Sequence, residues 1–171
     1  MEEFRLETPR MYLREFRLED ADDFYQLNLD PLVVQHTGDK PFADPSAAVA
    51  FIQSYDHYAR HGYGRWAVIL RQTEEFIGFC GLKYHPSNSE VDLGFRLRRS
   101  DWNKGLATEA ARTCLEYGFT QLNLDLIIGR VRQANQASIK VLEKIGMQRK
   151  GGFDFEGFPG YRYEISAAEY G

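Results

Sequence analysis

The residues whose types and spacing best suit chemistry are 102–109, which read WNKGLATE. They follow an apolar run over 91–97 that predicts a strand, and they begin a helical pattern that continues to about Leu122. The first backbone N–H groups of a helix have no partner inside the helix, and the helix dipole places partial positive charge there. Gly105 and Ala107 carry little or no side chain, so an anion can approach the backbone closely. The segment therefore predicts a phosphate site at the start of a helix.

Two common phosphate-binding motifs do not fit this segment. A P-loop closes with Gly-Lys-Ser/Thr, whereas Gly105 is preceded by Lys104 and followed by Leu106. The dinucleotide fingerprint needs three glycines at fixed spacing, and this segment has one. The segment instead resembles the pyrophosphate loop of the GNAT N-acetyltransferases, whose pattern is Gln/Arg-x-x-Gly-x-Gly/Ala. Gly105 and Ala107 match that pattern, and Trp102 stands where Gln or Arg is usual.

Two further segments resemble the same family, in the family's order and spacing. Residues 7–16, ETPRMYLREF, are similar to the start of the branch that contains the ribosomal-protein N-terminal acetyltransferases, as is the loop WNKGLATE. Residues 135–147 resemble the family's Asn-x-x-Ser…Lys-x-Gly-Phe signature, with Met147 in place of the usual Phe. Three ordered matches extend the resemblance over nearly the whole chain.

The elements that must hold these segments follow an α+β order. We expect strands at 11–16, 66–70, 76–82, 90–97 and 126–131, followed by a hairpin of 147–155 with 161–165. We expect helices at 20–29, from 44 to the glycines at 62 and 64, from 106 to about 122, and from 135 to 146. The resemblance implies the GNAT fold, a mixed and mostly antiparallel central sheet of about seven strands flanked by about four helices.

Composition indicates a globular chain rather than a disordered or membrane-spanning one. The 171 residues are 43% hydrophobic and predict one domain over 1–171. A net charge of −4 predicts no general attraction to nucleic acid, and no apolar run approaches the length of a membrane span. With no signal peptide in view, we expect Cys80 and Cys114 to be buried, reduced thiols in the cytoplasm. The histidines and cysteines have no metal-binding spacing, so we expect no metal site.

The resemblance implies direct transfer of an acetyl group from acetyl-CoA to a primary amine in a ternary complex. The strand backbone at 95–97 would pair with the pantetheine as an added strand does, and one of its amides would donate to the thioester oxygen as negative charge develops. The expected contacts to the cofactor are Phe95, Arg96, Leu97, Asn103, Lys104, Gly105, Leu106, Ala107, Thr108, Asn135 and Ser138.

The sequence identifies the general acid and the general base less clearly than the cofactor contacts. Many members of the family use a tyrosine seven residues after the helix-capping Asn, and that position is Leu142 here. In the branch that this chain resembles, a serine three residues after that Asn is proposed as general acid, which is Ser138. The alternative is that Ser138 only satisfies backbone donors in the first helical turn. Asp92 and Glu156 are the candidate general bases, and Glu90 lies further out; for each, a solvated surface carboxylate is the alternative.

The acceptor stays open between a protein N-terminus and a small amine such as an antibiotic, a polyamine or an amino acid. A peptide α-amine, with a pKa of about 7.7–8.0, is easier to neutralise than a lysine at about 10.4, so a weak base suits it better. The helical segment before Gly62 carries aromatic residues and histidines that either line an acceptor pocket or pack internally: Tyr55, His57, Tyr58 and His61.

Two other classes of protein, besides the enzyme, fit the same residues. One is a non-catalytic acyl-CoA-binding sensor or regulatory module, which would bind acetyl-CoA without turnover. The other is a structural α+β domain, which would not bind CoA at all. A monomer and a homodimer are both compatible with the sequence.

Overall fold

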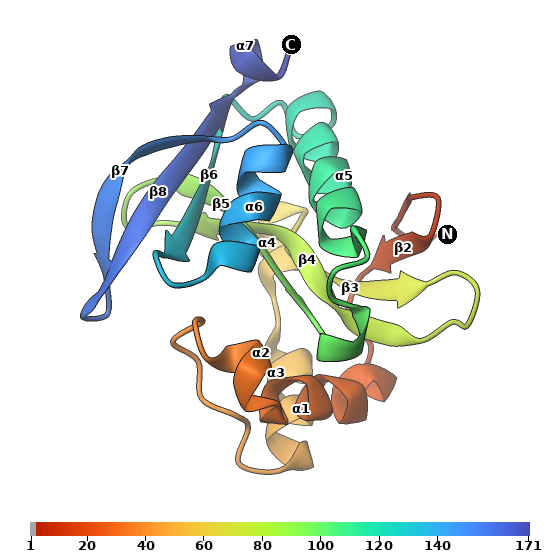
Figure 1. Cartoon of the computed structure of the whole chain (residues 1–171). Helices are drawn as coiled ribbons and strands as arrows, with labels where there is room; N and C mark the ends of the chain where they lie inside the picture. The colour runs from red at the N-terminus through yellow and green to blue at the C-terminus, as the bar shows by residue number, and fades with distance from the viewer. Residues whose placement is uncertain (1–2) are drawn as a thin grey trace.

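One mixed sheet forms the centre of the computed structural model, which describes residues 3–171 (Figure 1). Its eight strands lie in the order β1-β2-β3-β4-β5-β6-β8-β7. Every neighbouring pair is antiparallel except β5 with β6. The strands are β1 (Arg5–Glu7), β2 (Met11–Arg14), β3 (Arg65–Leu70), β4 (Phe76–His85), β5 (Glu90–Leu97), β6 (Leu126–Arg132), β7 (Gln148–Phe155) and β8 (Phe158–Ser166). The predicted α+β class is confirmed, with β1 as a strand beyond the expected seven.

Helices cover both faces of the sheet. α5 and α6 lie on one face, and the group α1 to α3 lies against the other (Figure 1). The helices are α1 (Ala21–Leu29), α2 (Pro31–Val34), α3 (Pro45–Ser54), α4 (His57–His61), α5 (Leu106–Thr120), α6 (Gln136–Lys144) and α7 (Ala167–Tyr170). Short 3-10 turns occur at η1 (Leu18–Asp20) and η2 (Arg99–Asp101).

The long helix expected between residue 44 and Gly62 is divided in two. Asp44 caps α3 by accepting from the Ala47 N–H, as expected, but the backbone of Tyr55 is extended at φ −73° and ψ 101°. The Tyr55 hydroxyl accepts a hydrogen bond from the Arg65 N–H at 2.8 Å, which ties this residue to the start of β3. A tertiary contact therefore overrides a continuous helical pattern.

The main core lies between the sheet and α5. Leu115 and Cys114 are at most 1% exposed and belong to one cluster with residues of β3, β4 and β6. Gly118 lets α5 approach the sheet, because a Cβ there would fall 2.7 Å from Cδ1 of Ile127. Cys80 and Cys114 are free and buried, with their sulfur atoms 3.6 Å apart. In the part of the chain that the structure describes, no helix has the length and apolar character needed to cross a membrane.

The parallel pair at the middle of the sheet separates soon after it forms. Within residues 3–171, β5 and β6 share one backbone register, Asp92 with Ile128. β5 then continues to Leu97 while β6 continues to Arg132, without further pairing between them. A gap therefore opens toward the ends of both strands, where the chain turns into the segments before α5 and α6.

Because Leu115 is 1% exposed, we expect Leu115→Ala to lower the free energy of unfolding by about 2–5 kcal/mol, through lost burial and the cavity left behind. Urea titration followed by circular dichroism measures this value. The adjacent Glu116 is exposed, so Glu116→Ala is the matched control and should change stability by less than about 0.5 kcal/mol. Equal effects of the two changes would contradict the packing of α5 described above.

Candidate active site

The loop before α5 has the geometry of an anion site. Gly105 is the N-terminal cap of α5 with φ +77°, a left-handed conformation that favours glycine, and Asn103 also has a positive φ of 62°. No side chain caps the helix. The first N–H groups of α5, at 106–108, are therefore free to bind a negatively charged group, in agreement with the sequence prediction.

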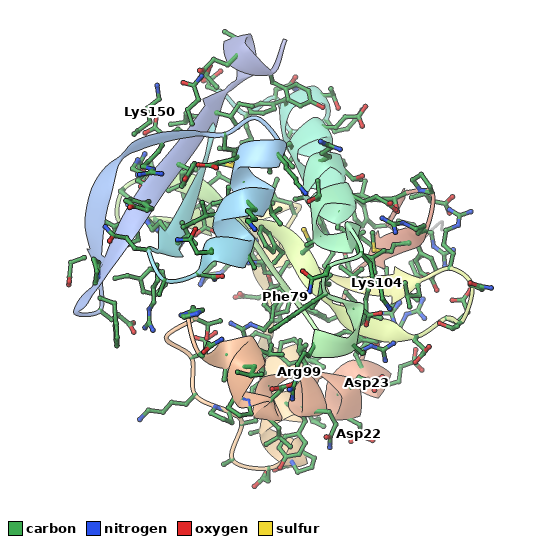
Figure 2. The ribbon with its side chains drawn as sticks, viewed as in Figure 1. Asp22, Asp23, Phe79, Arg99, Lys104 and Lys150 are labelled. Carbon is green, nitrogen blue, oxygen red and sulfur yellow. The ribbon has the colours of Figure 1, made fainter. Side chains whose placement is uncertain are left out.

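Residues from the start of the chain hold this loop in place. The Arg10 guanidinium donates from Nη1 to the carbonyl of Lys104 at 2.8 Å and from Nε to Glu109 Oε1 at 2.8 Å. Thr8 Oγ1 donates to Glu109 Oε2 at 2.6 Å. Figure 2 shows Lys104 on the segment that leads into α5. Sequence reasoning assigned no role to Thr8, Arg10 or Glu109, although all three belong to the segments that resembled the family.

The edge of β5 presents backbone groups to the gap. The Arg98 N–H donates to the carbonyl of Ile77 at 2.8 Å, so this residue forms a hydrogen-bonded pair with β4. Backbone groups alternate in direction along an antiparallel strand, and those of Leu97 and Phe95 therefore point away from β4, toward the gap. The indole of Trp102 occupies one of them, since its Nε1 donates to the Leu97 carbonyl at 2.8 Å. The N–H of Phe95 remains directed at the gap, as the predicted thioester contact requires.

At the start of α6, the two predicted polar residues lie side by side. Asn135 is the N-terminal cap, and its Oδ1 accepts from the Ser138 N–H at 3.3 Å. Ser138 is partly exposed. Leu142, at the position where many relatives have a tyrosine, is 3% exposed and packs in the core. Because Leu142 has no hydroxyl, Ser138 is the hydroxyl-bearing residue at the start of α6.

Asp92, predicted as a candidate base, is poorly suited to that role. Its carboxylate contacts Arg65 Nη2 at 2.7 Å and His85 Nε2 at 2.5 Å, and the residue is 8% exposed. Burial alone would raise the pKa of Asp92, but Arg65 and then His85 outweigh it and hold the pKa far below its ordinary value. A carboxylate with such a low pKa is a weak base. Asp92 anchors Arg65 and His85 at the junction of β5 and β6, and its role as a base stays a prediction that this geometry disfavours.

Of the other two carboxylates, Glu90 lies at the start of β5 and Glu156 lies in the turn between β7 and β8. Glu90 contacts Arg130 at 2.9 Å and also Arg162, and the bond to Arg162 lowers the pKa of Glu90 despite burial. Glu156 is exposed in the turn between β7 and β8, with φ 52°. A Cβ added to Gly38 would fall 2.7 Å from Glu156 Oε2, so the turn meets the segment between α2 and α3.

The aromatic residues and histidines near Gly62 mostly serve the structure. His57 contacts the Tyr63 carbonyl at 2.5 Å through Nδ1 and accepts from the Tyr84 N–H at 2.9 Å through Nε2. The Tyr58 hydroxyl bonds to the backbone of Phe16 at 3.2 Å. Bonds of this kind favour internal packing over an acceptor pocket, at least for His57 and Tyr58.

Comparisons with known proteins agree with this geometry. Residues 10–148 match the family described as the acetyltransferase (GNAT) domain. The uncharacterised N-acetyltransferase p20 of Bacillus licheniformis is 38% identical over 148 residues, which cover 85% of this chain and 83% of that protein. A crystal structure of a GNAT-family acetyltransferase from Bacillus anthracis has a TM-score of 0.85 at 24% identity, covering 96% of this chain and 99% of that one.

A second structure bears on the predicted branch of the family. The ribosomal-protein alpha-N-acetyltransferase RimL, in complex with coenzyme A, has a TM-score of 0.81 at 16% identity and covers 95% of this chain and 98% of that one. At this identity the likeness concerns the fold. The fold and the loop before α5 are those of the acetyltransferase class. The family match then fixes the assignment: this chain belongs to the GNAT acetyltransferases.

We expect Asp92→Asn to destabilise the protein by about 3 kcal/mol at pH 7, because it leaves a partly buried Arg65, with its side chain 17% exposed, without its anion. The folded pKa of Asp92 lies below its unfolded value of about 3.9, so the ionised carboxylate stabilises the fold above about pH 4 and loses this effect as pH falls through the folded pKa. Urea unfolding of both proteins should show a difference in unfolding free energy that is constant from pH 7 to about pH 4. Below about pH 4 this difference should shrink. A difference that grows on acidification would contradict the ion pair.

Proposed function

We propose that this protein transfers the acetyl group of acetyl-CoA directly to a primary amine while both substrates are bound. The acceptor is the N-terminal amine of a protein or the amine of a small molecule. Transfer of an acyl group to an amine is the chemistry of the family to which the chain belongs. The direct mechanism and the acceptor class are our proposal.

The observation that carries the proposal is the gap between β5 and β6, which ends at the uncapped start of α5. The residues present fit acetyl-CoA at two points. Free N–H groups at 106–108 suit the pyrophosphate, and the backbone of Phe95 suits the amide groups of the pantetheine arm. Asn135 and Ser138, at the start of α6, lie at the end of β6 on the other side of the gap.

The proposed chemistry needs three tasks from this chain. The N–H of Phe95 donates to the thioester oxygen as negative charge develops there. The neutral amine forms the new C–N bond as the C–S bond breaks, and the proton lost from the amine passes to Glu156 through water. Ser138 donates a proton to the departing thiolate, whose pKa of about 8.5 makes this help useful but not essential.

A non-catalytic acyl-CoA-binding module is the second candidate function. Two observations favour it: Leu142 replaces the family's tyrosine, and Asp92 is held in ion pairs rather than free to accept a proton. Such a module would bind acetyl-CoA and leave every amine unmodified. Turnover with any amine at a rate above the uncatalysed reaction excludes it.

We expect acetyl-CoA and CoA, but not ATP, to raise the unfolding temperature, with about 2.7 kcal/mol of added stability at ~100 times the dissociation constant. Gly105→Val should abolish the shift, because valine is strained at φ +77° and crowds the N–H groups of the loop. Gly62→Val is the matched control: Gly62 has φ +79° and nothing lies within 4 Å of an added Cβ, so the change costs stability but leaves the CoA shift intact. No shift in the wild-type protein at saturating acetyl-CoA would refute the proposal.

We expect Ser138→Ala to lower kcat about tenfold, with little change in KM for acetyl-CoA, because protonation of the leaving thiolate acts after binding. Steady-state kinetics with any accepted amine gives both constants. Ser87, exposed in the turn between β4 and β5, provides the control Ser87→Ala, which should match the wild type. An unchanged kcat in Ser138→Ala would restrict Ser138 to a role in the helix cap.

A further inference from the structure

Arg96 on β5 and Arg132 on β6 lie on the two sides of the open part of the gap, at equivalent positions along their strands. Arg96 lies four residues after Asp92, and Arg132 lies four residues after Ile128, the two residues that share the last register of this parallel pair. Side chains alternate along a strand, and Val131 packs in the core below α5 and α6. Arg132, and by the same alternation Arg96, therefore face the opposite side of the sheet, away from the helices that border the cofactor.

Arg132 is a buried cation that forms no ion pair within the described residues. The residue is 8% exposed, and its Nη1 donates to the carbonyl of Gln35 at 3.2 Å. Its guanidinium carbon lies 4.0 Å from the ring centre of Phe158 and 5.0 Å from that of Phe155, while Nε has no hydrogen-bond partner. Within residues 3–171, Arg132 forms no ion pair with a carboxylate. A buried charge in this state costs free energy until an anion pairs with it.

Arg96 forms an ion pair with Asp39, a carboxylate that another anion can replace. Its side chain is 10% exposed, with Nη1 donating to Asn28 Oδ1 at 2.8 Å and Nη2 to Asp39 Oδ2 at 2.6 Å. Nε has no partner, and the guanidinium lies 5.1 Å from the ring centre of Phe79, which Figure 2 places between the sheet and the lower helices. The side chain of Asp39 is 62% exposed, so water or another carboxylate can replace it at small cost.

The same short segment contacts both arginines. Gln35 and Asp39 belong to the connection between α2 and α3, which therefore bridges the gap from the β6 side to the β5 side. A Cβ added to Gly38 would fall 2.7 Å from Glu156 Oε2 and 3.5 Å from Arg132 Nη2. The proposed base and the unpaired cation thus meet at one place beside the gap.

We propose that Arg96 and Arg132 bind a carboxylate of the acceptor, which makes the acceptor a small molecule with a carboxylate near its amine, such as a free amino acid. This inference rests on the proposed acetyl transfer and narrows its acceptor. Before the acceptor enters, Asp39 occupies the donors of Arg96; the acceptor carboxylate then replaces Asp39 and supplies the anion that Arg132 lacks. Guanidinium groups suit this role because their donors match the two oxygens of a carboxylate.

The local field disfavours a polycationic acceptor. Burial lowers the pKa of His36, and the charge of Arg132 lowers it further, so this position resists a second positive charge. A polyamine would bring further cations to the same place. The peptide N-terminus is also disfavoured, since its α-carboxyl group is an uncharged amide.

The test compares amino acids with their amides, which differ in the carboxylate and little else. Purified protein and acetyl-CoA are assayed with phenylalanine and phenylalaninamide, and with the matching pairs of leucine and alanine. The amides have the less basic amines, so they react better if the carboxylate is not recognised. We expect the acids to have at least a tenfold higher kcat/KM. Arg96→Gln and Arg132→Gln should remove this preference by lowering kcat/KM for the acids about tenfold to one hundredfold.

Asp39→Asn separates recognition from a purely structural role. If Asp39 competes with the acceptor for Arg96, its loss should raise kcat/KM for the acids, opposite to the effect of Arg96→Gln. If the ion pair only fastens the segment between α2 and α3, both changes should lower it. Arg149, half-exposed on β7 over the ring of Tyr161, gives the control Arg149→Gln, which should leave every pair of substrates unchanged.

Binding provides a readout that does not need turnover. Calorimetry of the CoA-saturated protein with N-acetylphenylalanine and its amide should show binding of the acid alone. Equal use or equal binding of acid and amide, a preference for the amide, or binding of neither overturns the carboxylate proposal while the CoA shift, and with it the proposed function, stands. Loss of the CoA shift in the wild type would remove both. If Arg132→Gln does not fold, Arg96→Gln and Asp39→Asn decide the question together.

Discussion

β5 and β6 share one backbone register, Asp92 with Ile128, and then separate. A strand edge inside a sheet leaves N–H and C=O groups that need partners, since an unpaired buried backbone group costs as much as a lost hydrogen bond. Here the indole of Trp102 satisfies one carbonyl, that of Leu97, and the backbone of Phe95 faces the gap. An extended ligand with amide groups of its own satisfies this edge as a further strand would. The separation of two strands is therefore the constraint on which the proposed cofactor site depends.

Two sets of contacts keep the gap in a fixed shape. At its closed end, Arg65 of β3 and His85 of β4 both hold Asp92, so three strands are joined at the junction. At its open end, Arg10 connects the turn before β2 to the loop before α5 through Glu109 and the Lys104 carbonyl. Both sets are charge-assisted; the contacts of Asp92 are partly buried, where such bonds are stronger, whereas those of Arg10 are exposed. These contacts therefore hold the proposed cofactor loop in place without a ligand.

What the sequence predicted well is local. The loop around Gly105, the cap at Asn135 and the order of the strands follow from turn residues, capping residues and apolar periodicity within short windows. The break between α3 and α4 was missed because it depends on a bond from Tyr55 to Arg65, which periodicity does not register.

Long-range pairing explains which contacts of the site the sequence did not indicate. Asp92 was predicted as a base because its neighbours in sequence do not reveal Arg65, 27 positions away, which lowers its pKa. Arg96 was expected to contact the cofactor through its backbone, and nothing local indicated that its side chain meets Asp39 or lies opposite Arg132. Such pairs become visible only when the sheet brings distant segments together.

Hydrogen exchange of individual amides, followed by NMR with and without saturating acetyl-CoA, tests most directly whether the gap is the cofactor site. We expect slower exchange at the N–H of Phe95 and at the first N–H groups of α5, with no change along the exposed edge strand β7. Protection confined to other elements, or none at Phe95 when acetyl-CoA is fully bound, would contradict it.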